Sequence, residues 1–324
     1  MRRQANWPLK PACSAIWPIG LRCAGQRYIL NVITIACAAD SVPIALSDAS
    51  PAIRSHARRR GLARALALAL AGAGAGAGGG AARAVDVPAV AAAADLEFAL
   101  VELARRFQAD TGHVVRLTFG SSGNFAQQIA HGAPFELFLS ADEQYVLRLA
   151  EQGHARDRGA LYAIGRLALF GPHGSPLEVD SQLEGLARAL AEGRIRRFAI
   201  ANPEHAPYGR AARAALQHAG LWSRIAPHLV LGENAAQAAQ FAASGSSQGG
   251  IVPLSLSKAP AMAALGRFAT IPADWHASEP LRQRMVLTRR AGPVAAAFFD
   301  YLQRPAARAI LLRHGFALAG EAAP

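Results

Sequence analysis

Cysteine is scarce in this chain of 324 residues, and the positions of the few cysteines exclude several kinds of chemistry. Cys13, Cys23 and Cys37 are the only three, and all lie before residue 85. Residues 85–324 therefore offer no disulfide, no thiolate metal ligand and no thiol nucleophile. Such a composition suits a protein that works in an oxidising compartment.

Most of the chain also lacks an excess of positive charge. The net charge is +12, but residues 1–84 hold 11 Lys and Arg against two acidic residues, Asp40 and Asp48. Residues 85–324 keep 23 basic and 20 acidic residues, a net charge of +3. A basic surface for nucleic acid is not indicated there.

Motifs of enzymes are absent or misplaced. None of the nine histidines after residue 84 belongs to a His-Glu-x-x-His motif or a cluster with metal-ligand spacing. Gly74–Gly79 has dinucleotide-binding glycine spacing but follows no strand. Gly245–Gly249 matches the nucleophile pattern G-x-S-x-G, yet the expected helix precedes Ser247 and the strand follows it, which reverses the required order. A secreted hydrolase using Ser247 is therefore the weaker alternative, and we expect no enzyme.

Two neighbouring carboxylates also have a structural interpretation. Asp142 and Glu143 follow Ser140 and Ala141, and a paired-carboxylate site is one explanation. The same four residues match a helix N-cap with acidic residues in the first turn. We expect the cap.

Residues 58–84 have the pattern of a secretory signal peptide. Arg58, Arg59 and Arg60 form the charged start, residues 61–80 an apolar run, and Ala82-Arg83-Ala84 a cleavage site of small residues. A transmembrane anchor is the rival, but the strongly apolar part is short and half of it is Ala and Gly. We expect export and cleavage after Ala84.

Residues 1–57 do not fit this scheme, because a signal peptide starts near the N-terminus. We interpret them as a doubtful extension from an over-extended gene model, with the true start at a non-Met codon. The alternative is a lipoprotein signal with the apolar run 28–36 and Cys37 as the lipidated residue. Thr34-Ile35-Ala36-Cys37 is a poor lipobox, so we rank this alternative low.

After residue 85, short apolar runs alternate with helical periodicity, as in βαβ units on a largely parallel sheet. The pattern predicts an α/β fold with two lobes, in which the apolar run 162–170 crosses between them. Residues 85–168 and 277–324 form the first lobe, and residues 169–276 the second. We expect strands at 88–94, 113–119, 135–139, 197–201, 250–254 and 284–288, and helices at 96–111, 124–131, 183–192, 209–219, 235–243, 293–302 and 306–313.

Small hydroxyl residues join the second expected strand to its helix. The loop Gly120-Ser121-Ser122-Gly123-Asn124 directs free N–H and O–H donors toward one point, although such a loop alone is more often a helix cap. Similar junctions occur at 93–95, 206–209 and 233–235. Four helix N-termini facing one cleft would hold a dianion through their partial positive charge, without Lys or Arg.

Five stretches together resemble the periplasmic molybdate-binding proteins of ABC transporters, which have the type II solute-binding fold. These are Val90–Leu96 (VAAAADL), Phe119–Gly123 (FGSSG), Gly132–Asp142 (GAPFELFLSAD), Ala201–Gly209 (ANPEHAPYG) and Gly250–Pro253 (GIVP). The resemblance covers essentially all of residues 85–324. It implies a monomeric periplasmic carrier with a ligand cleft between its lobes. It also implies molybdate or tungstate as ligand, no cofactor, and delivery to a permease and its ATPase in the inner membrane.

The resemblance also implies the residues that contact the oxygens of the anion. These are Ala94, Asp95, Ser121, Ser122, Tyr208 and Ala235. Molybdenum is then held only as the oxyanion, chiefly by Asp95, Ser122, Tyr208 and Ala235. Some members have a tyrosine donor where this chain has Pro253.

Asp95 is the second departure from the family pattern, because members carry Ser or Asn there. We expect its carboxylate to cap its own helix, a role that its position after a strand favours. The alternative is that it accepts the O–H of a protonated oxyanion such as phosphate, which would change the ligand.

Overall fold

Two five-stranded sheets organise the part of the chain that the structure describes. The structure is a computed structural model, and it describes residues 87–318. The predicted extension 1–57, the predicted signal peptide 58–84 and all three cysteines lie outside these residues. No helix within residues 87–318 is long and apolar enough to cross a membrane.

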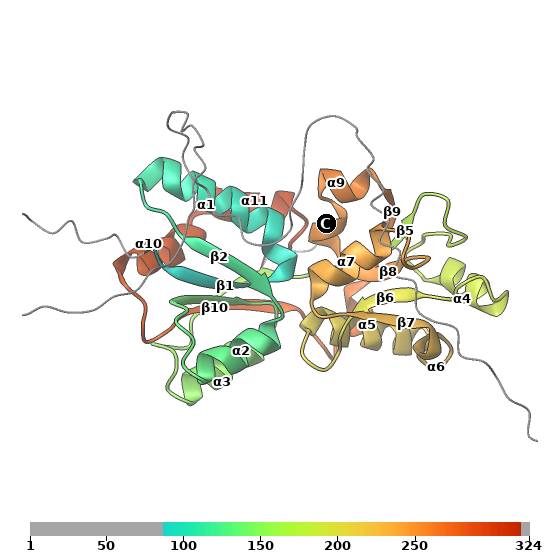
Figure 1. Cartoon of the computed structure of the whole chain (residues 1–324), viewed down its shortest axis with the longest axis horizontal. Helices are drawn as coiled ribbons and strands as arrows, with labels where there is room; N and C mark the ends of the chain where they lie inside the picture. Colours follow the sequence, from blue (N-terminus) through green and yellow to red (C-terminus); the bar gives the residue numbers. More distant parts are fainter. Residues whose placement is uncertain (1–86, 319–324) are drawn as a thin grey trace, which may run out of the picture. The chain divides into compact units, whose positions relative to one another are not determined.

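The first lobe is built on a mixed sheet (Figure 1). Its strands, in spatial order, are β2 (Arg116–Gly120), β1 (Ala89–Ala93), β3 (Leu137–Ser140), β10 (Arg282–Leu287) and β4 (Ala160–Ile164). β1 is parallel to β2 and β3, and β10 is antiparallel to β3 and β4. The helices of this lobe are α1 (Glu97–Thr111), α2 (Ser122–Ala130), α3 (Glu143–Glu151), α10 (Pro293–Leu302) and α11 (Pro305–Arg313).

Alternation along these strands places apolar side chains on both faces of the sheet. In β1, Val90 and Ala92 pack with the helices α1, α10 and α11, whereas Ala91 packs with α2 and α3. Successive side chains of a strand point to opposite faces, so a continuous apolar strand needs helices on both sides. Figure 1 shows α1 and α11 on one side of the sheet and α2 and α3 on the other.

The second lobe repeats the same strand order. Its strands, in spatial order, are β7 (Leu229–Gly232), β6 (Phe198–Ala201), β8 (Gly250–Pro253), β5 (Leu167–Pro172) and β9 (Gly266–Thr270). β6 is parallel to β7 and β8, and β5 is antiparallel to β8 and β9. Its helices are α4 (Glu184–Ala191), α5 (Pro207–His218), α6 (Trp222–Ile225), α7 (Ala235–Ala243), α8 (Leu254–Ser257) and α9 (Pro260–Ala263). Short 3₁₀ turns are η1 (Ala94–Leu96), η2 (Ala226–His228) and η3 (Ala273–His276).

The chain crosses between the sheets twice. The apolar run 162–170 contributes to β4 in the first sheet and to β5 in the second, with Gly165 and Arg166 between them. The return crossing lies between β9 and β10. The predicted α/β fold with two lobes is therefore confirmed, while the exact lobe ranges stay a proposal. β7, β9 and the short helices α6, α8 and α9 were not predicted.

Candidate functional site

Four helix starts surround one small cavity. They are the turn η1 after β1, the helix α2 after β2, and the helices α5 and α7 of the second lobe. The empty volume is about 190 Å³ including its open mouth. The walls include all six residues predicted to contact an anion, namely Ala94, Asp95, Ser121, Ser122, Tyr208 and Ala235.

Backbone N–H groups at three of these starts are available to a ligand. Ser122 is the first residue of α2, Ala235 is the first residue of α7, and Tyr208 follows Pro207 at the start of α5. The first N–H groups of a helix have no carbonyl partner within it, and they carry the positive end of the helix dipole. Among residues 87–318, no Lys or Arg lines the cavity, so its attraction for an anion comes from these dipoles.

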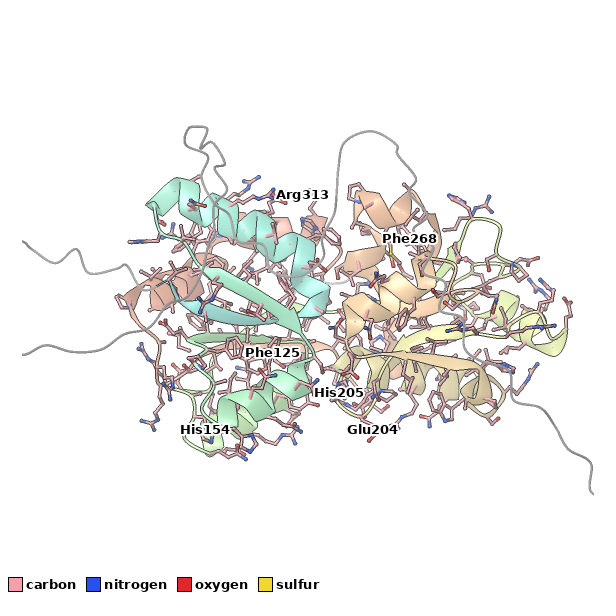
Figure 2. All side chains as sticks on the ribbon, viewed as in Figure 1. Phe125, His154, Glu204, His205, Phe268 and Arg313 are labelled. Atoms are coloured by element: carbon pink, nitrogen blue, oxygen red, sulfur yellow. The ribbon has the colours of Figure 1, made fainter. Side chains whose placement is uncertain are left out.

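The two serines of the loop have different hydrogen-bond partners. Ser122 is 1% exposed, and its Oγ accepts a hydrogen bond from the N–H of Ala141 at 3.0 Å. This bond leaves the hydroxyl proton of Ser122 free to be donated to a ligand. Ser121 instead donates its hydroxyl proton to the carbonyl oxygen of His205, which belongs to the second lobe and is labelled in Figure 2.

Asp95 takes part in a buried network that joins the two lobes. Its Oδ2 accepts hydrogen bonds from Tyr208 Oη at 2.9 Å and from Gln283 Nε2 at 2.6 Å. Gln283 Oε1 in turn accepts from Tyr162 Oη at 2.8 Å. The expected capping role is wrong, because Oδ2 accepts from Tyr208 and Gln283, and Oδ1 accepts from no N–H group among residues 87–318. Its two donors come from α5 and β10.

Burial changes the proton affinities in this network. Burial raises the pKa of Asp95 to about 6, although the hydrogen bonds from Gln283 and Tyr208 oppose the rise. Burial and then the charge of Asp95 raise the pKa of Tyr208 well above its usual value. The phenol therefore stays protonated and donates to Asp95, and its backbone N–H is the donor left for a ligand.

Further contacts hold the lobes together around the cavity. The N–H of Gly123 donates to the carbonyl oxygen of His205 at 3.0 Å, and a Cβ at Gly123 would lie 2.5 Å from that oxygen. Arg210 on α5 forms an ion pair with Asp142 of the first lobe, and it also donates to Tyr145 Oη at 3.0 Å. Both lobes thus contribute to the closed arrangement of the site.

The structure also bears on the predictions for Asp142 and Ser247. Asp142 is the N-cap of α3 and accepts from the N–H of Gln144 at 2.9 Å, which confirms the cap. Ser247 Oγ donates to the carbonyl oxygens of Phe241 and Gly249 at 3.1 and 2.9 Å, so its proton is already engaged. Within residues 87–318, no group of three or more His, Cys, Asp and Glu could hold a metal ion.

Sequence reasoning missed four residues beside the cavity: Gln283, Tyr162, His205 and Arg210. Gln283 is completely buried just before the expected strand 284–288, but it stands between Arg282 and Arg284, so the local pattern gives no signal for it. The partners of the other three lie 22 to 121 residues away along the chain, so no local pattern identifies them.

Comparison with known proteins agrees with this architecture. Residues 88–317 match the family described as bacterial extracellular solute-binding protein. The molybdate-binding protein ModA of Azotobacter vinelandii is 36% identical over 232 residues, which cover 71% of this chain and 89% of that protein. The Rhodobacter capsulatus protein of the same name is 35% identical over 231 residues, covering 70% and 86%.

A solved structure supports the same relationship. The structure of the Azotobacter vinelandii periplasmic molybdate-binding protein aligns with a TM-score of 0.65 and 34% identity, covering 71% of this chain and 99% of that one. The sulfate-binding protein SubI of Mycobacterium tuberculosis, at 16% identity and a TM-score of 0.57, shares the fold. The chain belongs to the family of bacterial extracellular solute-binding proteins.

Proposed function

We propose that this protein is the solute-binding component of an ABC importer and that it binds molybdate in the cavity between its lobes. The observation that carries the proposal is the convergence of four helix starts and the Ser122 hydroxyl on one small space without Lys or Arg. Such neutral donors suit a tetrahedral dianion that carries no proton. The relatives named as molybdate-binding proteins support this choice of ligand.

The contacts are assigned to the oxygens of the anion. The hydroxyl and N–H of Ser122 and the N–H groups of Tyr208 and Ala235 are the proposed donors, with Ala94 and Ser121 shaping the wall. No side chain is a direct ligand of molybdenum. Tungstate has the same shape and charge, so the same donors would bind it, and we include it among the ligands.

The biological setting is part of the proposal. A monomeric carrier exported by residues 58–84 would close on the anion in the periplasm and deliver it to a permease and its ATPase. N-terminal sequencing of the exported protein tests this directly, since cleavage after Ala84 leaves Val85 as the first residue. A lipid-modified Cys37 at the start of the mature chain would refute it.

Calorimetric titration of the purified protein with molybdate, tungstate, sulfate and phosphate tests the ligand. We expect one site per chain, similar affinities for molybdate and tungstate, and weaker binding of sulfate and phosphate. Strong binding of phosphate without binding of molybdate would refute the assignment. Turnover of a generic ester would instead favour the alternative function, a hydrolase that uses Ser247, although the hydroxyl of Ser247 donates to backbone carbonyl oxygens in this structure.

A further inference from the structure

The carboxylate of Asp95 has one oxygen without a hydrogen-bond partner. Oδ2 accepts from Tyr208 and Gln283, whereas Oδ1 is buried and has no partner among the described residues. Asp95 is 1% exposed and lines the cavity. An unpaired buried carboxylate oxygen is unfavourable, so a group in the cavity that shares a proton with it would remove this cost.

The protonation state of the Asp95 carboxyl group determines whether it repels a bound oxyanion or donates a hydrogen bond to it. An ionised carboxylate beside a dianion brings two acceptors together with no proton between them, and they repel each other. A protonated carboxyl group has one O–H donor, which forms a strong hydrogen bond to a negatively charged oxygen. Because Oδ2 already accepts two donors, Oδ1 is the oxygen that can carry this proton.

We propose that Asp95 couples oxyanion binding to the uptake of one proton, which it holds on Oδ1 and donates to an oxygen of the bound molybdate. The proton comes from solvent, and no bond within the anion forms or breaks. The inference rests on the proposed function, because it concerns the same cavity and the same ligand. Asp95 departs from the family pattern, and under this proposal it is the residue that makes binding depend on pH.

The groups around Asp95 favour this assignment of the proton. Tyr208 on α5 and Tyr162 on β4 are the titratable groups that face it, and burial followed by the charge of Asp95 raises the pKa of each well above its usual value. Gln283 on β10 and Ser255 on α8 carry no charge, and Ser255 Oγ donates to the backbone oxygen of Asp95 at 2.8 Å. Asp95 is therefore the group in this network that changes charge near neutral pH.

His205 is the other titratable residue beside the cavity. Its Nδ1 lies 3.1 Å from Ser121 Oγ, and its Nε2 lies 3.5 Å from Glu233 Oε2. A ring nitrogen of an imidazole can also accept a proton, so a proton taken up on binding has two candidate acceptors. The test must separate Asp95 from His205.

Titration calorimetry of the purified protein with sodium molybdate counts the proton. At pH 7, in buffers of different ionisation enthalpy and equal ionic strength, the dependence of the observed enthalpy on the buffer gives the number of protons taken up. With a pKa of about 6, Asp95 is roughly one-tenth protonated before binding, so we expect about 0.9 proton per molybdate. The dissociation constant should then rise about tenfold between pH 7 and pH 8, by the same linkage.

Three variants assign the proton to a residue. In Asp95→Asn the amide is a permanent donor, so proton uptake should fall to near zero and the affinity should become equal at pH 7 and pH 8. Glu97→Gln is the matched control, because it removes a half-buried carboxylate next to this segment that does not line the cavity. Glu97→Gln and His205→Asn should both keep the uptake of about one proton.

The outcomes separate this inference from the proposed function. Molybdate binding without proton uptake and without dependence on pH would overturn the role of Asp95 and leave the function standing. Uptake that persists in Asp95→Asn, or disappears in His205→Asn alone, would also overturn it. Failure of molybdate to bind at any pH would refute the function, and the inference with it.

A spectroscopic measurement on the unmodified protein does not depend on whether Asp95→Asn folds. Infrared difference spectra should show a new carbonyl band of a protonated carboxyl group when molybdate is added at pH 7.5. Absence of this band would overturn the proposal.

Discussion

Replacing Ser122 by alanine tests the proposed anion contacts most directly. The hydroxyl of Ser122 has two roles in the structure, because its oxygen accepts from the N–H of Ala141 and its proton is free for a ligand. Ser122→Ala removes both. We therefore expect a loss of affinity and, separately, a loss of stability in the unliganded protein.

The loss of affinity and the loss of stability can be estimated separately. A hydrogen bond donated to a charged group contributes about 1.5–3 kcal/mol, so the affinity for molybdate should fall roughly ten- to hundredfold. The N–H of Ala141 is left buried without an acceptor, which costs about 1–3 kcal/mol of unfolding free energy and should lower the melting temperature by several degrees. The contact with Ala141 is the reason for this expected loss of stability.

The assay combines calorimetry with thermal unfolding in the presence and absence of molybdate. Ser257→Ala is the matched control, since Ser257 is equally buried but donates to the carbonyl oxygen of Pro253 at 3.1 Å and does not line the cavity. It should lose stability without losing affinity. An unchanged affinity in Ser122→Ala, with a lower melting temperature, would refute the assignment of Ser122 as a donor to the anion.

Four further predictions follow from the same contacts. Arg210→Gln removes the ion pair with Asp142, whose side chains are 18% and 14% exposed, so molybdate should dissociate faster and bind roughly tenfold more weakly, as measured by stopped-flow kinetics. Gly123→Ala places a Cβ 2.5 Å from the carbonyl oxygen of His205 and 2.9 Å from Tyr145 Oη of its own lobe, so the affinity should fall at least about tenfold and the unliganded melting temperature should also fall. Raising the salt from 0.05 to 0.5 M should weaken binding by less than roughly threefold, because no Lys or Arg lines the cavity, and a steep dependence in calorimetry would contradict this. The pKa of Asp95 rises from 3.8 to about 6 on folding, so the folded state binds this proton more tightly; stability should fall by about 3 kcal/mol as the pH rises from about 3 to about 7, and denaturant titrations of Asp95→Asn should lack that loss.

The sequence predicted the site through local chemistry. Each helix start has a signal that spans only a few residues. These signals are Gly-flanked serines after a strand, a proline at the start of a helix, and an asparagine cap. Because helices that follow parallel strands begin at the same edge of a sheet, these junctions could be expected to meet. The elements that carry them were long enough to show their periods.

The role of Asp95 was not predictable in the same way. An aspartate after a strand caps a helix when no stronger donors are near, and its donors here are Tyr208 and Gln283, which lie 113 and 188 residues away along the chain. Tyr208 and Gln283 reach Asp95 only because α5 and β10 pack beside it, and the sequence around residue 95 does not predict that packing. The resemblance did identify position 95 as unusual, and the structure supplies the partners that explain why a carboxylate is tolerated there.

The donors to Asp95 lie close to the segments that cross between the lobes. Gly165 lies in the crossing from β4 to β5, and its N–H donates to the carbonyl oxygen of Leu281 in the return crossing at 2.8 Å. A side chain at Gly165 would collide with the hydroxyl of Tyr208 and the amide of Gln283, the two donors to Asp95. The two donors to Asp95 therefore lie against the crossing from β4 to β5, which is hydrogen-bonded to the return crossing. Because Tyr208 belongs to the second lobe and Asp95 to the first, the proposed opening of the lobes would break their hydrogen bond and would change how the charge on Asp95 is stabilised.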